Sequence, residues 1–262
     1  MKTIEIRNAT VIYDTKTALD HISWSVEKGE RYFILGANGA GKTTLVKMLL
    51  GYLWPRFGAQ ISILGEKYGS VCLSELRKRI AWVSPFAHKY TQNPNLTVCE
   101  LVLSGRDATF GVYFSEITPE DEEAARRVLA LLNADSLLHQ KVQTLSSGEQ
   151  VKVLIARALM TNPELMILDE PNVFMDVSGR EFLLKTIARL AEEHPELTIV
   201  FITQRIEDIL PVFTHGMILK HGKILVNGPR EEVLTEENLK LAYDMDLKLV
   251  QTHSGRYWTV IE

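Results

Sequence analysis

Apolar stretches of strand length recur along the chain, separated by turn residues and by segments whose apolar positions follow helical spacing. Two of these stretches, residues 165–168 and 197–202, are almost continuously apolar, and a predicted helix at about 179–193 lies between them. Strands that are covered on both faces show such unbroken apolar runs. The pattern therefore predicts an α/β fold whose parallel sheet is covered on both faces.

Shorter runs of alternating or β-branched residues predict antiparallel strands elsewhere in the chain. They are residues 4–6, 10–13, 22–26 and 60–64. Residues 216–220 and 223–226 flank His221-Gly222, which predicts a β-hairpin with a tight turn. A charged helix is predicted near residues 231–243.

A further helix is predicted to begin after Thr118. Threonine is a favoured helix cap, Pro119 suits the first helical turn, and the acidic residues that follow suit its positive end. Apolar residues then recur at helical spacing, which supports a helix packed on a core.

The most informative motif is a glycine-rich segment between the apolar stretch 31–35 and a helical run at 45–50. It fits the pattern G-x-x-x-x-G-K-[ST] of phosphate-binding loops and consists of Gly36, Ala37, Asn38, Gly39, Ala40, Gly41, Lys42, Thr43 and Thr44. Lys42 is predicted to reach the β- and γ-phosphates, and Thr43 to ligate Mg²⁺. The alternative is a chance match, with a probability of roughly 1% in a chain of this length. We therefore predict that the chain binds ATP or GTP.

Two carboxylates follow the apolar stretch 165–168 directly. In isolation, Asp169 and Glu170 could be solvated acids at the end of a strand. Beside a phosphate-binding loop, Asp169 is predicted to hold Mg²⁺, and Glu170 to act as the general base for an attacking water.

A third motif precedes the helical run 151–159 and reads Leu145-Ser146-Ser147-Gly148-Glu149-Gln150. Alone, it would be a serine-capped helix start. In this order with the other two motifs, the chain resembles the ATP-binding cassette (ABC) proteins, whose signature L-S-G-G-Q stands at this place. The sequence departs from that signature at Ser147 and Glu149.

The resemblance covers about residues 3–230 and implies a fold: a P-loop ATPase core with a parallel sheet, an N-terminal antiparallel β subdomain and an inserted helical lobe. We expect a single domain over residues 1–262, with the lobe at about 85–160. The resemblance also implies a head-to-tail dimer with a second copy or a homologous subunit. Two ATP molecules would lie at the dimer interface, each contacted by the other subunit's Ser146, Ser147, Gly148 and Glu149.

The resemblance assigns roles to two more residues. Tyr13 stands where the family stacks an aromatic ring on adenine, although an ordinary strand tyrosine is the alternative. Asp176 matches the aspartate that communicates across the dimer.

Two positions depart from the family's catalytic pattern. Pro85 stands at the place of a glutamine, and its side chain cannot ligate Mg²⁺. Gln204 stands at the place of the switch histidine, where it can donate a hydrogen bond to the γ-phosphate but cannot take a proton. We expect slow hydrolysis in which Gln204 takes part, and Glu170 argues that hydrolysis persists.

Composition and charge limit the classes of partner and the cellular compartment that the chain fits. A formal net charge of -4 gives no basic field for nucleic acid, and two distant cysteines fit a reducing compartment. No apolar run reaches the roughly 20 residues that span a bilayer, and residues 1–7 resemble a strand more than a secretion signal. We expect a cytoplasmic protein that reaches the inner membrane through a permease partner.

The function that these features favour is ATP hydrolysis in the cytoplasmic subunit of an ABC transporter, with ATP and Mg²⁺ as cofactors. Some segments are similar to importers of metal chelates and cobalamin, and others to a branch linked to molybdenum transport or photorepair; neither likeness fixes a cargo. The alternative is a soluble ABC ATPase in cluster assembly, translation or DNA repair. A kinase with the same phosphate loop would have no use for the third motif.

Overall fold

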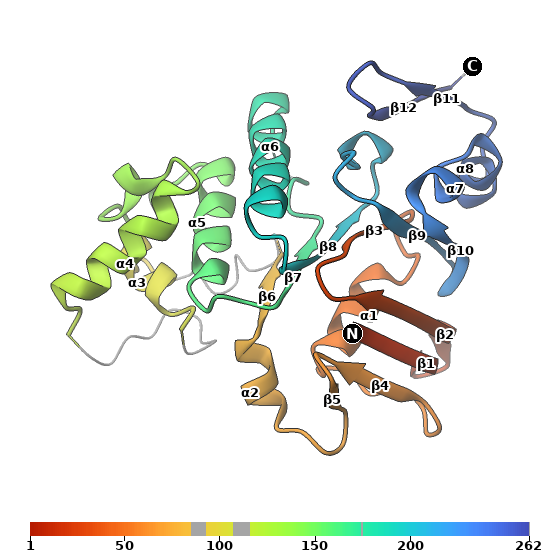
Figure 1. The fold of residues 1–262 in the computed structure, drawn as a ribbon, viewed down its shortest axis with the longest axis horizontal. Coiled ribbons are helices and arrows are strands. Elements are labelled where there is room, and N and C mark those ends of the chain that lie inside the picture. Colours follow the sequence, from red (N-terminus) through yellow and green to blue (C-terminus); the bar gives the residue numbers. More distant parts are fainter. Residues whose placement is uncertain (85–92, 107–115, 174, 262) are drawn as a thin grey trace. The chain divides into compact units, whose positions relative to one another are not determined.

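The computed structural model describes residues 1–84, 93–106, 116–173 and 175–261. The chain forms two compact units, one of Met1–Leu73 with Ala191–Glu262 and one of Ser74–Leu190 (Figure 1). The second unit is thus inserted into the sequence of the first. The expectation of a single domain over residues 1–262 stays a prediction, and Pro85 lies outside the described residues.

The first unit contains an antiparallel sheet with the strand order β2-β1-β4-β5. Its strands are β1 (Lys2–Tyr13), β2 (Lys16–Glu27), β4 (Gln60–Ile63) and β5 (Glu66–Lys67). Alternate side chains of β2 are buried, as expected for a sheet with one covered face. The two short runs at 4–6 and 10–13 are parts of one long strand, β1.

Parallel strands form the centre of the first unit. The strand β3 (Arg31–Leu35) pairs in parallel with β8 (Thr198–Thr203) and with β9 (His215–Lys220). Every residue of β3 and β8 is buried, which explains the continuous apolar runs. The strand β10 (Lys223–Pro229) pairs antiparallel with β9 across the His221-Gly222 turn, so the predicted hairpin is confirmed.

The second unit combines two parallel strands with helices. The strands β6 (Ile80–Val83) and β7 (Leu165–Asp169) pair in parallel. Three helices, α3, α4 and α5, pack against one another, in agreement with the helical lobe that the resemblance implies. The helices of this part are α2 (Leu73–Lys78), α3 (Val98–Leu103), α4 (Pro119–Ala130), α5 (Ser147–Leu159) and α6 (Val177–Glu193), with short 3-10 turns η2 (Asp135–Leu137) and η3 (Val142–Thr144).

The helix predicted after Thr118 is confirmed as α4. The Thr118 hydroxyl accepts a hydrogen bond from the amide of Asp121, and the Asp121 side chain accepts one from the amide of Thr118. Pro119 occupies the first turn, where no amide donor is needed.

The C-terminal segment of the first unit differs from the prediction. The single helix expected near 231–243 is wrong, because the chain forms α7 (Arg230–Val233) and α8 (Glu236–Tyr243) instead. The Thr235 hydroxyl accepts from the amide of Asn238 and so starts a new helix. A hairpin of β11 (Lys248–Gln251) and β12 (Tyr257–Val260), which the sequence pattern did not predict, follows (Figure 1).

Within the described ranges, no helix combines the length and the apolar character that crossing a bilayer requires.

Candidate nucleotide-binding site

The glycine-rich loop connects β3 to α1 (Lys42–Leu49) in the first unit. A Cβ atom at Gly36 would lie 2.5 Å from the carbonyl oxygen of Leu219, and one at Gly41 would lie 2.8 Å from that of Ala18. Gly41 also has a φ of +107°, and Gly39 one of +79°, in the left-handed region. Packing and backbone conformation therefore require glycine at these positions of the motif.

The N-terminus of α1 offers backbone amides to an anion. Gly41 is its N-cap and has no side chain with which to cap the helix. Ala37, Asn38, Gly39 and Thr43 are exposed around this helix start. Helix starts without a side-chain cap carry unpaired N–H groups and a partial positive charge, so the loop fits a phosphate group.

Lys42 places a positive charge inside the loop. Its side chain is 5% exposed, and its Nζ donates to the carbonyls of Gly36 at 2.7 Å and Ala37 at 3.0 Å. An ammonium group held this close to the loop backbone can compensate phosphate charge that backbone amides alone leave uncompensated.

The turn between β9 and β10 forms a hydrogen bond with the glycine-rich loop. The Gly222 amide donates to the Ala40 carbonyl at 2.9 Å, and the Gly222 carbonyl accepts from the Asp20 amide at 2.8 Å. A Cβ atom at Gly222 would lie 2.6 Å from the carbonyl oxygen of Ala18. The sequence predicted this turn as a hairpin connection but not as a support for the glycine loop, a role that only tertiary packing reveals.

Tyr13 lies at the turn end of the β1–β2 hairpin. It is the last residue of β1, it pairs with Lys16, and it is 42% exposed. Two residues earlier in β1, Val11 pairs with Leu19, whose side chain borders Gly41. The ring is accessible for stacking, and its contact with adenine stays a prediction.

Gln204 follows the last residue of β8 and is half-buried. The Tyr243 hydroxyl donates to the Gln204 carbonyl at 3.1 Å. The next turn, η4 (Ile206–Asp208), is closed by a 2.9 Å hydrogen bond from the Thr203 hydroxyl to the Asp208 carboxylate. The backbone of Gln204 is therefore fixed at a strand end, and its part in hydrolysis stays a prediction.

In the second unit, Asp169 is the last residue of β7 and Glu170 follows it directly. Asp169 is 3% exposed, whereas Glu170 is half-buried. Glu170 has a φ of +50°, a conformation that residues other than glycine, asparagine and aspartate rarely adopt. Such strain costs on the order of 1–3 kcal/mol and concentrates at functional sites, which agrees with the role predicted for Glu170.

The third motif starts α5 with a reciprocal cap. The Ser146 hydroxyl accepts from the Glu149 amide, while the Glu149 carboxylate accepts from the Ser146 amide at 2.8 Å. The Ser146 hydroxyl also donates to the Glu149 carboxylate at 2.7 Å. This hydrogen bond and the one from the Ser146 amide lower the pKa of Glu149, so its carboxylate is charged at neutral pH. The predicted helix start is confirmed, and its contact with a nucleotide stays a prediction.

Gly148 and Ser147 make this helix start accessible. Apart from the chain neighbours of Gly148 and the backbone of its own helix, no heavy atom of the described residues lies within 4 Å of the position that a Cβ would take there. Ser147 is exposed. Packing among the described residues therefore does not explain why position 148 is glycine.

Asp176 has a local structural role. Its Oδ1 accepts a 2.7 Å hydrogen bond from the Gly179 amide, next to the start of α6 at Val177. This contact stabilises the first turn of the helix, and communication across a dimer stays a prediction.

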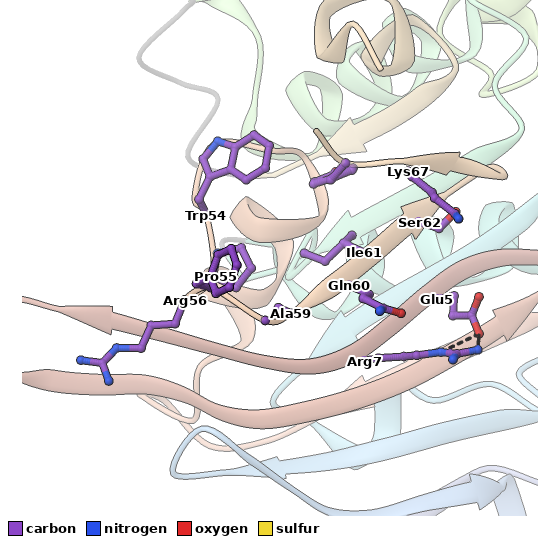
Figure 2. Close-up of a pocket in the computed structure, with 13 residues that line it drawn as sticks. Glu5, Arg7, Trp54, Pro55, Arg56, Ala59, Gln60, Ile61, Ser62 and Lys67 are labelled. Carbon is purple, nitrogen blue, oxygen red and sulfur yellow. Dashed lines mark hydrogen bonds and ion pairs between the residues drawn. The ribbon is translucent and has the colours of Figure 1, made fainter. Parts of the chain in front are cut away.

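A separate hollow of about 890 Å³ lies on the antiparallel sheet of the first unit. Figure 2 shows Trp54, Pro55 and Arg56 of the α1–β4 connection on one side and Gln60 and Ile61 of β4 beside them. None of the residues predicted to bind the nucleotide lines this hollow.

Comparison with known proteins places these motifs in a family. Residues 19–173 match the family model described as ABC transporter. The chain is 36% identical to the uncharacterized ABC transporter ATP-binding protein YlmA of Bacillus subtilis, over 99% of this chain and 97% of that protein. It is 33% identical to the zinc uptake system ATP-binding protein ZurA of Listeria innocua, over 88% of this chain and 87% of that protein.

Among solved structures, the fold is similar to an inward-facing conformation of a transporter described as of the metal-chelate ABC type. The TM-score is 0.79 and the identity 25%, with 99% of this chain and 96% of that chain covered. The family match, the nearly full-length relatives and this shared fold show that the chain belongs to the ABC transporter family, as an ATP-binding subunit with ATPase activity.

Proposed function

We propose that the chain binds Mg²⁺–ATP on its glycine-rich loop and hydrolyses it to drive a membrane permease. The observation that carries this proposal is the start of α1, where an uncapped helix N-terminus and the buried ammonium of Lys42 meet the same loop. On binding, phosphate oxygens would take the place of the loop carbonyls as partners of Lys42.

The family resemblance assigns the remaining chemistry to residues whose chemical nature suits it. A hydroxyl and a carboxylate are oxygen donors of the kind that Mg²⁺ prefers, and we assign this role to Thr43 and Asp169. Glu170 would accept the proton of the attacking water, Gln204 would donate to the γ-phosphate, and Tyr13 would stack on adenine.

We assign the start of α5 to the nucleotide of a second subunit. The accessible Ser147 and the open space around Gly148 support this assignment, because a phosphate group could approach the backbone there. The partner is a second copy or a homologous ABC subunit, and ATP would close the pair head-to-tail. Asp176, next to the start of α6, would respond to this closure.

We further assign the chain to the cytoplasmic side of the inner membrane, held there by a permease subunit. The names of the relatives favour transport over the soluble roles in cluster assembly, translation or DNA repair. A metal ion or a metal chelate is the cargo class that the zinc uptake relative and the metal-chelate type structure support.

Glu170→Gln tests the proposal as a whole. The amide keeps the shape of the side chain but cannot act as a base, so ATP should bind and remain intact. Sedimentation of this variant with ATP and Mg²⁺ should show a dimer, whereas the variant without nucleotide should be a monomer. A variant that hydrolyses ATP at the wild-type rate would reject Glu170 as the base. A monomer with ATP demonstrably bound would reject the composite dimer.

A further inference from the structure

The loop that carries Gln204 is held by residues from the unpredicted C-terminal segment. Residues 204–208, here called the switch loop, follow β8 and end in η4. Two side chains from beyond residue 240 bind its backbone, and they are Tyr243 at the end of α8 and Arg256 between β11 and β12. Neither residue belongs to a sequence motif.

Tyr243 anchors Gln204 itself. Its hydroxyl donates to the Gln204 carbonyl at 3.1 Å. Burial, together with the nearby Glu207 carboxylate, raises the pKa of Tyr243 well above its ordinary value of 10. The phenol is therefore protonated throughout the physiological range and acts as a hydrogen-bond donor.

Arg256 anchors the next turn of the same loop. Its Nε and Nη2 both donate to the Glu207 carbonyl, at 3.1 and 2.6 Å. The backbone around Arg256 is itself fixed, because the Thr252 amide donates to the Arg256 carbonyl at 2.8 Å and the Thr252 hydroxyl accepts from the Arg256 amide. Two donors from one guanidinium fix both the position and the direction of the loop backbone.

Further contacts hold the C-terminal segment against the rest of the first unit. Arg230 donates to the Gly255 carbonyl, and its guanidinium lies 4.7 Å from the centre of the Tyr257 ring. On the other side, Lys220 forms a 2.6 Å ion pair with Asp244, next to Tyr243. Lys220 directly precedes the turn whose Gly222 donates a hydrogen bond to the glycine-rich loop. The C-terminal segment therefore contacts both the switch loop and the strand that leads to the turn supporting the glycine-rich loop.

The side chain of Gln204 contrasts with its anchored backbone. Among the residues that the structure describes, none forms a hydrogen bond with its amide group, whereas Tyr243 binds its carbonyl. A glutamine side chain has more rotatable bonds than a histidine side chain. A fixed backbone is therefore more important for orienting the amide of a glutamine toward a phosphate.

We propose that Tyr243 and Arg256 are positioning residues, which hold the switch loop so that the Gln204 amide meets the γ-phosphate of bound ATP. The inference rests on the proposed role of Gln204 in hydrolysis. It adds a function for the C-terminal segment, which thereby becomes part of the hydrolytic apparatus without touching the nucleotide.

Tyr243→Phe tests the proposal, because it removes one hydroxyl and keeps the ring. The steady-state kcat of the full chain should fall about 3- to 10-fold, the range expected for one neutral hydrogen bond. The KM for ATP and the calorimetric ATP affinity should stay within about 2-fold of wild type. Tyr257→Phe is the matched control, since it removes from the same segment a hydroxyl that forms no hydrogen bond with residues 204–208 and keeps the ring that faces Arg230. Its kcat should equal that of wild type.

A double-mutant cycle with Gln204→Ala separates the inference from the proposed function. If Tyr243 acts through Gln204, Tyr243→Phe should not slow the Gln204→Ala variant any further. If Gln204→Ala alone matches wild type, the proposed role of Gln204 fails, and the positioning role fails with it. If Gln204→Ala is slow but Tyr243→Phe matches wild type, or slows both backgrounds equally, only the positioning role is overturned.

Arg256→Lys provides an independent test if Tyr243→Phe does not fold. Lysine keeps the charge but cannot place two donors on the Glu207 carbonyl. A lower kcat with unchanged ATP affinity is the expected result. A wild-type kcat in a folded Arg256→Lys variant would overturn the proposal.

Discussion

The Ser146 hydroxyl donates a 2.7 Å hydrogen bond to the Glu149 carboxylate at the start of α5. The family signature has a neutral glutamine where this chain has Glu149. A negative charge therefore stands on the helix N-terminus that is proposed to receive the γ-phosphate of the partner subunit. The carboxylate stabilises the helix start, and it also opposes the approach of a second anion.

Glu149→Gln should therefore strengthen ATP-induced dimerisation. In the Glu170→Gln background, which retains ATP, the added Glu149→Gln change should lower the dissociation constant of the dimer about 3- to 10-fold. Sedimentation equilibrium at fixed ATP and Mg²⁺ measures this constant. Weaker dimerisation would show that the carboxylate itself contacts the partner's nucleotide or its metal ion.

Glu149→Gln in the otherwise wild-type chain should be less stable than wild type at neutral pH. The sign of the pH dependence of this stability difference follows from the pKa of Glu149. Hydrogen bonds from Ser146 lower the pKa of Glu149 in the folded state, so its stabilisation is present above the ordinary glutamate pKa. That stabilisation is lost as the pH falls through the lowered value. Thermal melts should therefore show that the free energy of unfolding of wild type at pH 7 exceeds that of Glu149→Gln by less than about 1 kcal/mol. In strong acid the two proteins should be equally stable. A difference that grows toward acid pH would contradict this account.

Gly148→Ala should separate stability from dimerisation. Alanine favours helix over glycine by up to about 1 kcal/mol, and nothing crowds a Cβ at this position. The melting temperature should stay equal or rise, and ATP should bind the monomer normally, but the ATP-induced dimer should weaken. Glu120→Ala, at the equivalent position of α4, is the control and should leave dimerisation unchanged. Normal dimerisation of Gly148→Ala would remove this helix start from the proposed interface.

Gln204→His should raise the rate of hydrolysis. Histidine would restore the family's switch residue on a backbone that Tyr243 already fixes. A gain of about 10-fold corresponds to roughly 1.4 kcal/mol off the barrier, a reasonable value for one improved hydrogen bond. Steady-state ATPase rates of wild type, Gln204→His and Gln204→Ala decide the matter. A slower histidine variant would mean that the site is specialised for glutamine.

The sequence predicted most of the elements that local patterns control. The buried strands β7 and β8 correspond to the almost continuous apolar runs 165–168 and 197–202. The glycine loop shows its characteristic spacing. Each of these patterns depends on residues close together in the chain. Caps such as Thr118 and Ser146 are also local, and both are confirmed.

The missed features depend on contacts between distant residues. Gly222 supports Ala40, and Tyr243 binds Gln204, over separations that no local pattern reveals. The hairpin of β11 and β12 escaped prediction because its outward face carries apolar residues, Val250 and Trp258, which remain exposed. The break between α7 and α8 at Thr235 was overlooked because the charged pattern runs through it.

The affinity of Lys42→Ala for ATP tests the central claim most directly, because every proposed step begins with phosphate held on the glycine loop. Lys47→Ala is the control, since it removes an exposed positive charge from the same helix. Isothermal titration calorimetry with ATP and Mg²⁺ should show binding roughly 10- to 100-fold weaker for Lys42→Ala. Lys47→Ala should bind like wild type, and both variants should melt as folded proteins. Unchanged ATP affinity in a folded Lys42→Ala variant would contradict the assignment of the loop.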